Sequence, residues 1–192
     1  MIILVFSILF SFANFAHAQA DLPGKIRGYK VYNAKIIVRT APAEKSAESG
    51  AELFVKIGEP ELTDVSLAGV TIELPTEIKS SEQSGTIDFL TFYDFRVNDV
   101  AVEIEEYKNS FELKKNHLIK LLKPIKISIG AKQSLRGAFS ELIKSKNDWT
   151  VTGRIFVFGR FKKSFLKFKR VVPIEINLQI ENPFKAVSSA RF

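Results

Sequence analysis

Pro173-Ile-Glu-Ile-Asn-Leu-Gln-Ile-Glu181 decides the fold, because apolar and polar residues alternate along the whole stretch. An alternation of period two indicates a β-strand with one buried face and one face in solvent. The buried face would be formed by Ile174, Ile176, Leu178 and Ile180. This is the strongest pattern of its kind in the chain, and it predicts a sheet that covers a core.

The same alternation recurs towards the N-terminus, in residues 70–74, 87–95, 100–104 and 125–129. Turn-forming residues separate these runs, at Ser84-Gly85, Asn98-Asp99, Lys108-Asn109 and Lys146-Asn147-Asp148. Short strands with this spacing favour an antiparallel sandwich or barrel. Only Ser140–Lys146 fits a helix, of about two turns, with Ser140 as its N-cap. We predict an all-β, immunoglobulin-like or fibronectin-III-like antiparallel β-sandwich with one short helix.

The N-terminal third is expected to contain one strand and one loop. Tyr29–Arg39 is rich in β-branched residues, which favour strands. Residues 41–50 are small, polar and charged, which is typical of a loop. The predicted organisation is an export signal (1–18), an N-terminal extension (19–50), the sandwich (51–184) and a C-terminal tail (185–192).

The export signal is predicted from residues 2–15, which are uncharged and mostly apolar. Ala16-His17-Ala18 suits cleavage before Gln19, and Ala18-Gln19-Ala20 is an alternative. The segment lacks the usual Lys or Arg, so an uncleaved membrane anchor is the competing interpretation. Its uncharged stretch barely reaches the roughly 20 residues that a span needs. We expect a periplasmic or extracellular protein without a transmembrane span in its mature chain.

Several kinds of chemistry are not expected. The chain has no Cys, which excludes disulfides, thiolate zinc sites, cysteine nucleophiles and a lipid-modified cysteine. His117 is the one histidine after the signal, and a lone histidine in a polar linker is usually a surface residue. Glu103 and Glu105 share the solvent face of a strand rather than forming a cation site. Neither phosphate-binding nor dinucleotide-binding glycine motifs occur. We therefore predict a non-enzymatic protein without cofactor or metal.

The net charge of +7 resides in residues 154–170, since the rest of the chain has 21 basic and 21 acidic residues. This segment has no acidic residue and seven basic ones: Arg154, Arg160, Lys162, Lys163, Lys167, Lys169 and Arg170. Five Phe residues lie among them, and Gly159–Ser164 is expected to turn a hairpin. Cations beside aromatics suit an anionic lipid surface or a polyanionic envelope polymer. Alternatively, the Phe residues are core and the cations protect a sheet edge from aggregation. Export argues against nucleic acid as the partner.

A second candidate site is apolar. Phe89, Phe92, Tyr93 and Phe95, together with Leu90, place apolar residues on both faces of one strand. Such a strand is either covered on both sides or forms one wall of an apolar cleft. A cleft would support a lipid-binding or lipid-transfer protein with a cavity between the sheets. A third hypothesis is a structural or partner-binding module, which would show a long open sheet edge without lysines.

Five segments, in order, resemble the group 2 late embryogenesis abundant (LEA) family, also called the WHy domain. They are Val65–Pro75 (the family's first long strand), Phe95–Ile104 (strand-turn-strand), Leu122–Gly130 (a proline-led strand), Trp149–Ile155 (a tryptophan-to-glycine strand) and Pro173–Ile176 (the closing strand). Leu74-Pro75-Thr76 replaces the family's usual Asn-Pro-Asn-type motif, which indicates a distant branch. The resemblance implies a sandwich of about seven strands without catalytic residues. It also implies stress or desiccation protection and, in some branches, lipid binding.

Overall fold

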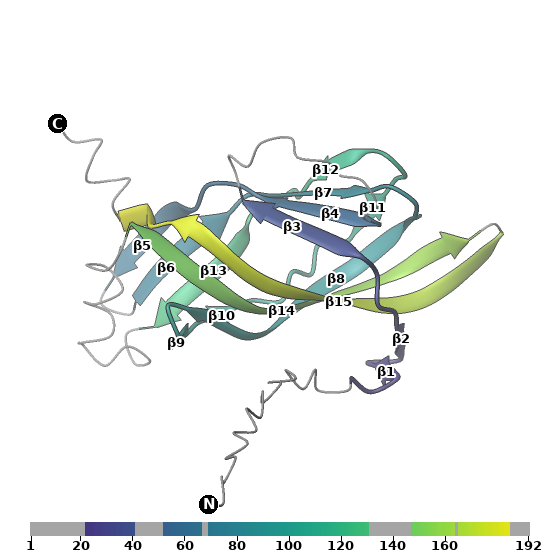
Figure 1. Ribbon diagram of the computed structural model, residues 1–192, viewed down its shortest axis with the longest axis horizontal. Coiled ribbons are helices and arrows are strands. Elements are labelled where there is room, and N and C mark those ends of the chain that lie inside the picture. Colours follow the sequence, from purple (N-terminus) through teal and green to yellow (C-terminus); the bar gives the residue numbers. More distant parts are fainter. Residues whose placement is uncertain (1–21, 41–51, 67–68, 131–146, 164, 185–192) are drawn as a thin grey trace, which may run out of the picture.

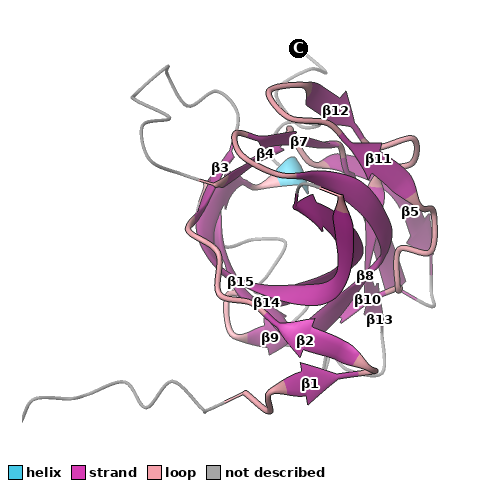
Figure 2. Cartoon of the chain, turned by 90° about the vertical axis from the view of Figure 1, so that its right-hand side faces the viewer, coloured by secondary structure: helices cyan, strands magenta, loops and turns pink. Residues whose placement is uncertain are grey.

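The computed structural model describes residues 22–40, 52–66, 69–130, 147–163 and 165–184, which form a β-sandwich (Figure 1). Regular structure in these residues is almost entirely strand, with one helical turn at 183–184 (Figure 2). The predicted all-β sandwich is confirmed. The helix predicted over 140–146 lies outside the described residues.

One layer is a large sheet with the strand order β1-β2-β15-β14-β8-β11, and β9 pairs with β8 at its side. Its strands are β1 (Lys25–Ile26), β2 (Tyr29–Val31), β8 (Ser84–Val97), β9 (Val100–Ala101), β11 (Phe111–Leu113), β14 (Asp148–Lys163) and β15 (Leu166–Glu181). The long hairpin of β14 and β15 is its centre, paired from Asp148–Glu181 to Lys163–Leu166. The alternating stretch 173–181 therefore lies within β15.

Two smaller sheets form the opposite layer. One has the order β10 (Glu103–Ile104), β13 (Ile125–Gly130), β6 (Gly69–Leu74) and β5 (Glu61–Ser66). The other has the order β12 (Leu118–Lys120), β7 (Thr76–Ser80), β4 (Leu53–Ile57) and β3 (Ile36–Thr40). The chain passes from β6 to β7 at Pro75, whose missing N–H cannot join a strand ladder. That proline therefore marks where one small sheet ends and the other begins.

The core lies between the layers. Ile174, Ile176 and Ile180 of β15 are buried, as the alternation predicted, and Leu178 is half-buried. They share one hydrophobic cluster with residues of both small sheets, including Ile72, Ile78 and Ile127. Burying an aliphatic side chain contributes about 1.5–3 kcal/mol, so this shared cluster holds the layers together.

The single strand predicted over 29–39 is two strands that belong to different layers. β2 pairs in parallel with β15, whereas β3 pairs in parallel with β4. The chain between them, at Tyr32–Lys35, crosses from one layer to the other. A further hairpin precedes β2, because β1 pairs with β2 around Arg27-Gly28. Both turn residues have positive φ, 50° and 81°, which a two-residue hairpin turn of type I′ requires.

The segment Val65–Pro75, expected to be one long strand, contains a turn. β5 and β6 pair antiparallel with Ser66 opposite Gly69, so the chain reverses inside this segment. The other segments behind the family resemblance contain the expected strands: β8 to β10, β13, β14 and β15. The described residues contain fifteen strand segments instead of about seven, because turns and changes of sheet divide the longer runs.

Candidate functional site

We call the far end of the β14–β15 hairpin, residues 159–170, the distal hairpin. β8 accompanies β14 as far as Ser84, which lies opposite Lys162. Beyond that point the two strands pair only with each other, at Lys163 and Leu166, and the end of the hairpin extends past the other strands of the sandwich (Figure 1). The tip is therefore the part of the large sheet best placed to meet another surface.

Four cations lie on the outer face of the distal hairpin, and we call them the cation quartet: Arg160, Lys162, Lys167 and Lys169. Arg160 lies opposite Lys169, and Lys162 lies opposite Lys167. All four residues are exposed. Within the described residues, neither Lys162 nor Lys167 has an ion-pair partner. Like charges directly opposite one another destabilise a strand pair. The outer lysine pair thus presents uncompensated positive charge that an anion would relieve.

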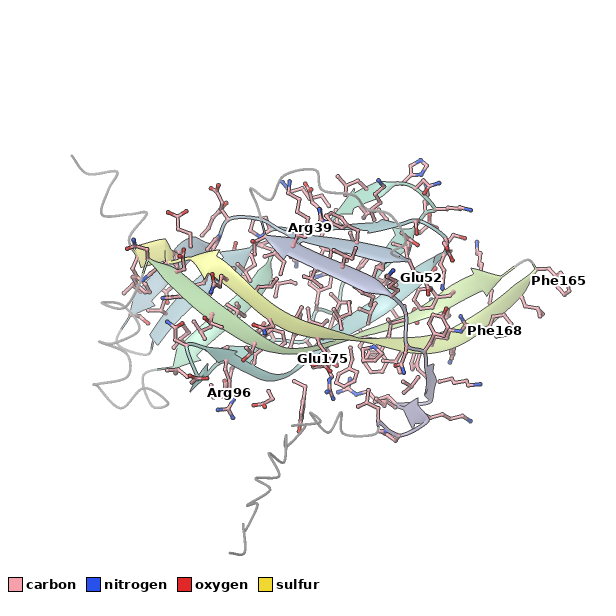
Figure 3. The ribbon with its side chains drawn as sticks, viewed as in Figure 1. Arg39, Glu52, Arg96, Phe165, Phe168 and Glu175 are labelled. Atoms are coloured by element: carbon pink, nitrogen blue, oxygen red, sulfur yellow. The ribbon has the colours of Figure 1, made fainter. Side chains whose placement is uncertain are left out.

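Exposed apolar side chains lie near the end of the same hairpin. Phe165 is 89% exposed, Leu166 is 50% exposed and Phe168 is 36% exposed. Phe165 lies at the free end of the hairpin (Figure 3). Phe161, which lies opposite Phe168 on the inner face of the hairpin, is buried. Exposed aromatics next to lysines suit the boundary between water and lipid headgroups, where both kinds of side chain find favourable surroundings.

Two residues that sequence reasoning missed, Asp88 and Tyr29, hold the pair of the quartet that lies farther from the tip. This pair is Arg160 and Lys169. Asp88 receives hydrogen bonds from Arg160 Nη2 at 2.8 Å, from Arg160 Nε at 3.1 Å and from the Tyr29 hydroxyl at 3.0 Å. Lys169 Nζ lies 5.7 Å from the centre of the Tyr29 ring. Burial, and next the bond to Asp88, raise the pKa of Tyr29. No sequence signal links these residues, because Asp88 and Arg160 are 72 positions apart.

The remaining predicted cations lie elsewhere. Arg154 forms an ion pair with Glu175 on the outer face, well behind the tip, and its charge is compensated. Arg170 faces the inner side, where its guanidinium lies 4.5 Å from the centre of the Tyr32 ring and 5.3 Å from that of Phe168. Lys163 ends β14 at the turn, and its side chain lies outside the described part of the chain. The structure thus brings four of the seven predicted residues together on one face.

The four apolar-cleft candidates do not share a wall. Phe89 stacks on Phe158, with ring centres 4.5 Å apart, beneath Tyr29 of the β1–β2 hairpin. Phe92 is half-buried against the core, and Phe95 is buried in it. Tyr93 is 64% exposed. Alternation and a bulge near Asp94 send these side chains to opposite faces of β8.

The apolar cavity that the described residues form between the layers is small. An apolar cavity of about 40 Å³ lies between the layers, lined by residues such as Val55, Ile78, Leu90 and Ile174. Sites for small molecules are roughly 300–1,000 Å³, and a water needs about 10–15 Å³. The cavity is thus at least about seven times smaller than such a small-molecule site.

Comparison with known proteins yields no matching family profile and no matching curated protein. Two solved structures are similar. A crystal structure of a protein from Archaeoglobus fulgidus has 12% identity and a TM-score of 0.37, covering 66% of this chain and 95% of its own. A solution structure of a protein assigned provisionally to the LEA group has 9% identity and a TM-score of 0.35, covering 68% of this chain and 72% of its own.

Side chains for other chemistry do not gather in the described residues. No group of His, Asp or Glu there is arranged to hold a metal ion. His117 is exposed, and its Nδ1 lies 2.9 Å from the carbonyl oxygen of Lys115. None of the helical structure in that part of the chain is long and apolar enough to span a membrane. The distal hairpin is therefore the feature that best supports a binding function.

Proposed function

We propose that this protein is an exported, non-enzymatic β-sandwich that binds anionic lipid surfaces of the cell envelope through its distal hairpin. The observation that carries the proposal is the outer lysine pair, Lys162 opposite Lys167, next to the exposed Phe165. Placing two uncompensated cations opposite one another lowers stability. An anionic surface would relieve this repulsion, so relief of the repulsion would favour binding.

The expected contributions are sufficient for reversible adhesion. Each basic side chain near an anionic membrane contributes about 1 kcal/mol. Inserting one exposed apolar side chain adds roughly 1.5–3 kcal/mol at most. Phe165 and Leu166 are exposed at the tip, so both can enter the headgroup layer while the lysines stay at its surface.

We also propose that the chain is a distant member of the group 2 LEA family and is associated with stress or with the cell envelope. Support comes from the order of the strand-turn-strand, proline-led, tryptophan-to-glycine and closing segments, each of which contains a strand. The function of such a protein would be to attach to surfaces rather than to transform a substrate.

Vesicle binding tests the proposal. The protein should sediment with vesicles that contain anionic lipid and not with neutral vesicles. This binding should be lost at about 1 M salt, where the Debye length is about 3 Å. A Phe165→Trp variant should show a blue shift of its emission on binding, because the tip enters a less polar layer. Equal binding to both kinds of vesicle, or none to either, would overturn the proposal.

A charge-matched pair of variants locates the binding surface. Lys162→Gln with Lys167→Gln should weaken binding to anionic vesicles by about thirtyfold, since about 1 kcal/mol is lost for each of the two cations. Lys120→Gln with Lys123→Gln, which removes two exposed lysines from the opposite layer, should leave it unchanged. If both double variants lose affinity equally, net charge rather than the hairpin drives adhesion. If the protein binds a soluble polyanion but no vesicle, the partner is an envelope polymer and the lipid proposal is wrong.

A further inference from the structure

A second surface lies at the other end of β15, along the free edge of residues 173–181. β15 pairs with β14 throughout its length, but on its other side β2 pairs with it only at Arg170 and Val171. The chain then leaves β15 after Tyr32 and crosses to β3 in the opposite layer. Within the described residues, no strand pairs with 173–181 on that side.

Some backbone N–H and C=O groups along this edge have no strand partner within the described residues. The carbonyl of Val171 points to this side, because it accepts a hydrogen bond of 2.9 Å from the N–H of Tyr32. Every second residue of an antiparallel strand directs its N–H and C=O to the same side. Glu175, Asn177 and Gln179 therefore direct their backbone groups to the open edge. Pro173, which has no N–H, occupies the position before them.

Beyond Pro173, the open edge lacks the lysines that commonly protect an edge strand against strand addition. Proteins commonly place lysines on exposed edges because a charged edge repels other strands. Residues 173–181 contain no Lys or Arg, whereas the distal part of the same strand carries Lys167 and Lys169. The two ends of β15 thus differ. Lysines protect the distal end against the addition of another strand, whereas residues 173–181 have no such lysine.

A groove of about 670 Å³ runs beside this edge. Ile36 and Val38 of β3 form one wall, and Ile174 and Leu178 of β15 form the other. Arg154 and Glu175, which form an ion pair, lie at its outer rim. Glu175 points away from the sandwich (Figure 3). Asn33 and Asn177 also line the groove, so polar groups share the lining with these apolar side chains. An extended segment next to β15 would place alternate side chains in this groove and the others beside the outer face.

We propose that the open edge of β15 binds one extended segment of a partner protein, in which apolar residues alternate with basic ones. The apolar residues would fill the groove beside Ile174 and Leu178. The basic residues would lie beside the outer face, where Glu175, Asn177, Gln179 and Glu181 point. Glu175 already forms an ion pair with Arg154, so Glu181 is the acid of this edge that has no ion pair within the described residues. A second copy of the chain fits less well, because β3 lies beside this edge and the copy would bring its own β3 to the same place.

A synthetic peptide of about eight residues, with Val and Lys alternating, provides the probe. It should bind saturably and slow the hydrogen exchange of the amides of Glu175, Asn177 and Gln179. The same peptide with N-methyl groups on the pairing side should bind at least about tenfold more weakly, because each backbone hydrogen bond contributes about 0.5–1.5 kcal/mol. A Val–Glu peptide should also bind more weakly. Absence of binding, or equal binding of the N-methylated peptide, would overturn the proposal.

Variants separate this surface from the distal hairpin. Asn177→Lys should reduce peptide affinity by about tenfold, because it places a cation on the receptive edge. Asn177→Thr, at the same exposed position, should retain it. Lys162→Gln with Lys167→Gln should leave peptide binding intact. If the edge amides become protected without peptide as the protein forms dimers, a second copy is the occupant and the proposed partner is wrong.

Discussion

Gly153 lies directly against Phe95, so close that a Cβ atom on Gly153 would be 2.7 Å from the Phe95 ring. Its φ is 153°, a value that residues with a side chain rarely adopt. The pairing of β14 with β8 shifts register at this point, and Asp94 in β8 has a φ of 47°. A bulge thus brings the backbone of β14 onto the buried ring, and only glycine leaves room for it.

Gly153→Ala should therefore lower the free energy of unfolding by about 1–3 kcal/mol, from overpacking and backbone strain. Urea unfolding followed by the fluorescence of Trp149, the one tryptophan, measures the change. Gly130→Ala is the matched control in β13, because a Cβ there meets nothing within 4 Å. Equal stability of the two variants would show that the contact with Phe95 is not limiting.

The alternation of Ile174, Ile176 and Ile180 identified the buried face correctly, because a period of two depends only on local geometry. The change of layer between β2 and β3 was not predictable in this way. Both halves of 29–39 are β-branched, and the choice between β15 and β4 as a neighbour depends on distant residues. The turn at Arg27-Gly28 does have a local signal, an X-Gly pair between two short runs that suit strands.

The candidate site was predictable in composition but not in arrangement. The excess of cations in 154–170 was visible, whereas the positions of Lys162 and Lys167 opposite one another depend on the register of the hairpin. Glu175 neutralises Arg154 from 21 residues away, and Asp88 fixes Arg160 from 72 residues away. Such pairings follow from the tertiary fold, so sequence reasoning included Arg154 and missed Asp88.

Two tyrosines should make the protein lose stability at alkaline pH. The hydrogen bond from Tyr32 to Glu52, 3.0 Å long, raises the pKa of Tyr32, and burial raises that of Tyr29. A pKa raised on folding means that the folded state retains its proton longer than the unfolded chain. The contribution is therefore fully present below about pH 10, where tyrosine titrates in an unfolded chain, and it is lost as the pH rises through the folded pKa.

Urea midpoints measured from about pH 8 to pH 11, around the ordinary tyrosine pKa of about 10, test this expectation. The wild-type protein should become less stable towards the alkaline end. Tyr32→Phe should be less stable near neutral pH, because Glu52 loses a donor, and its decline with pH should be shallower. Tyr93→Phe is the control, since Tyr93 is 64% exposed. A decline as steep in Tyr32→Phe as in the wild type would contradict the assignment.

Asp88 restrains Arg160, so Asp88→Asn should increase the affinity for anionic vesicles while it lowers stability by about 1 kcal/mol. The carboxylate holds Arg160 and accepts from Tyr29, and hydrogen bonds to a charged group contribute about 1.5–3 kcal/mol, part of which an amide retains. Vesicle sedimentation and urea unfolding measure the two effects. Asp64→Asn removes an exposed carboxylate from β5 and should change neither appreciably. An unchanged affinity would show that Arg160 takes no part in adhesion.

Lys167→Glu should separate stability from binding at the distal hairpin. The new carboxylate would lie opposite Lys162, and replacing repulsion by attraction across a strand pair contributes roughly 0.2–1 kcal/mol. The variant should therefore unfold at a higher urea concentration and bind anionic vesicles more weakly. Lys167→Gln, which removes the repulsion without adding attraction, should fall between the two proteins in both measurements. A variant that loses stability yet keeps its affinity would mean that the opposed lysines serve the fold, and the interpretation of Lys162 and Lys167 as a binding device would be wrong.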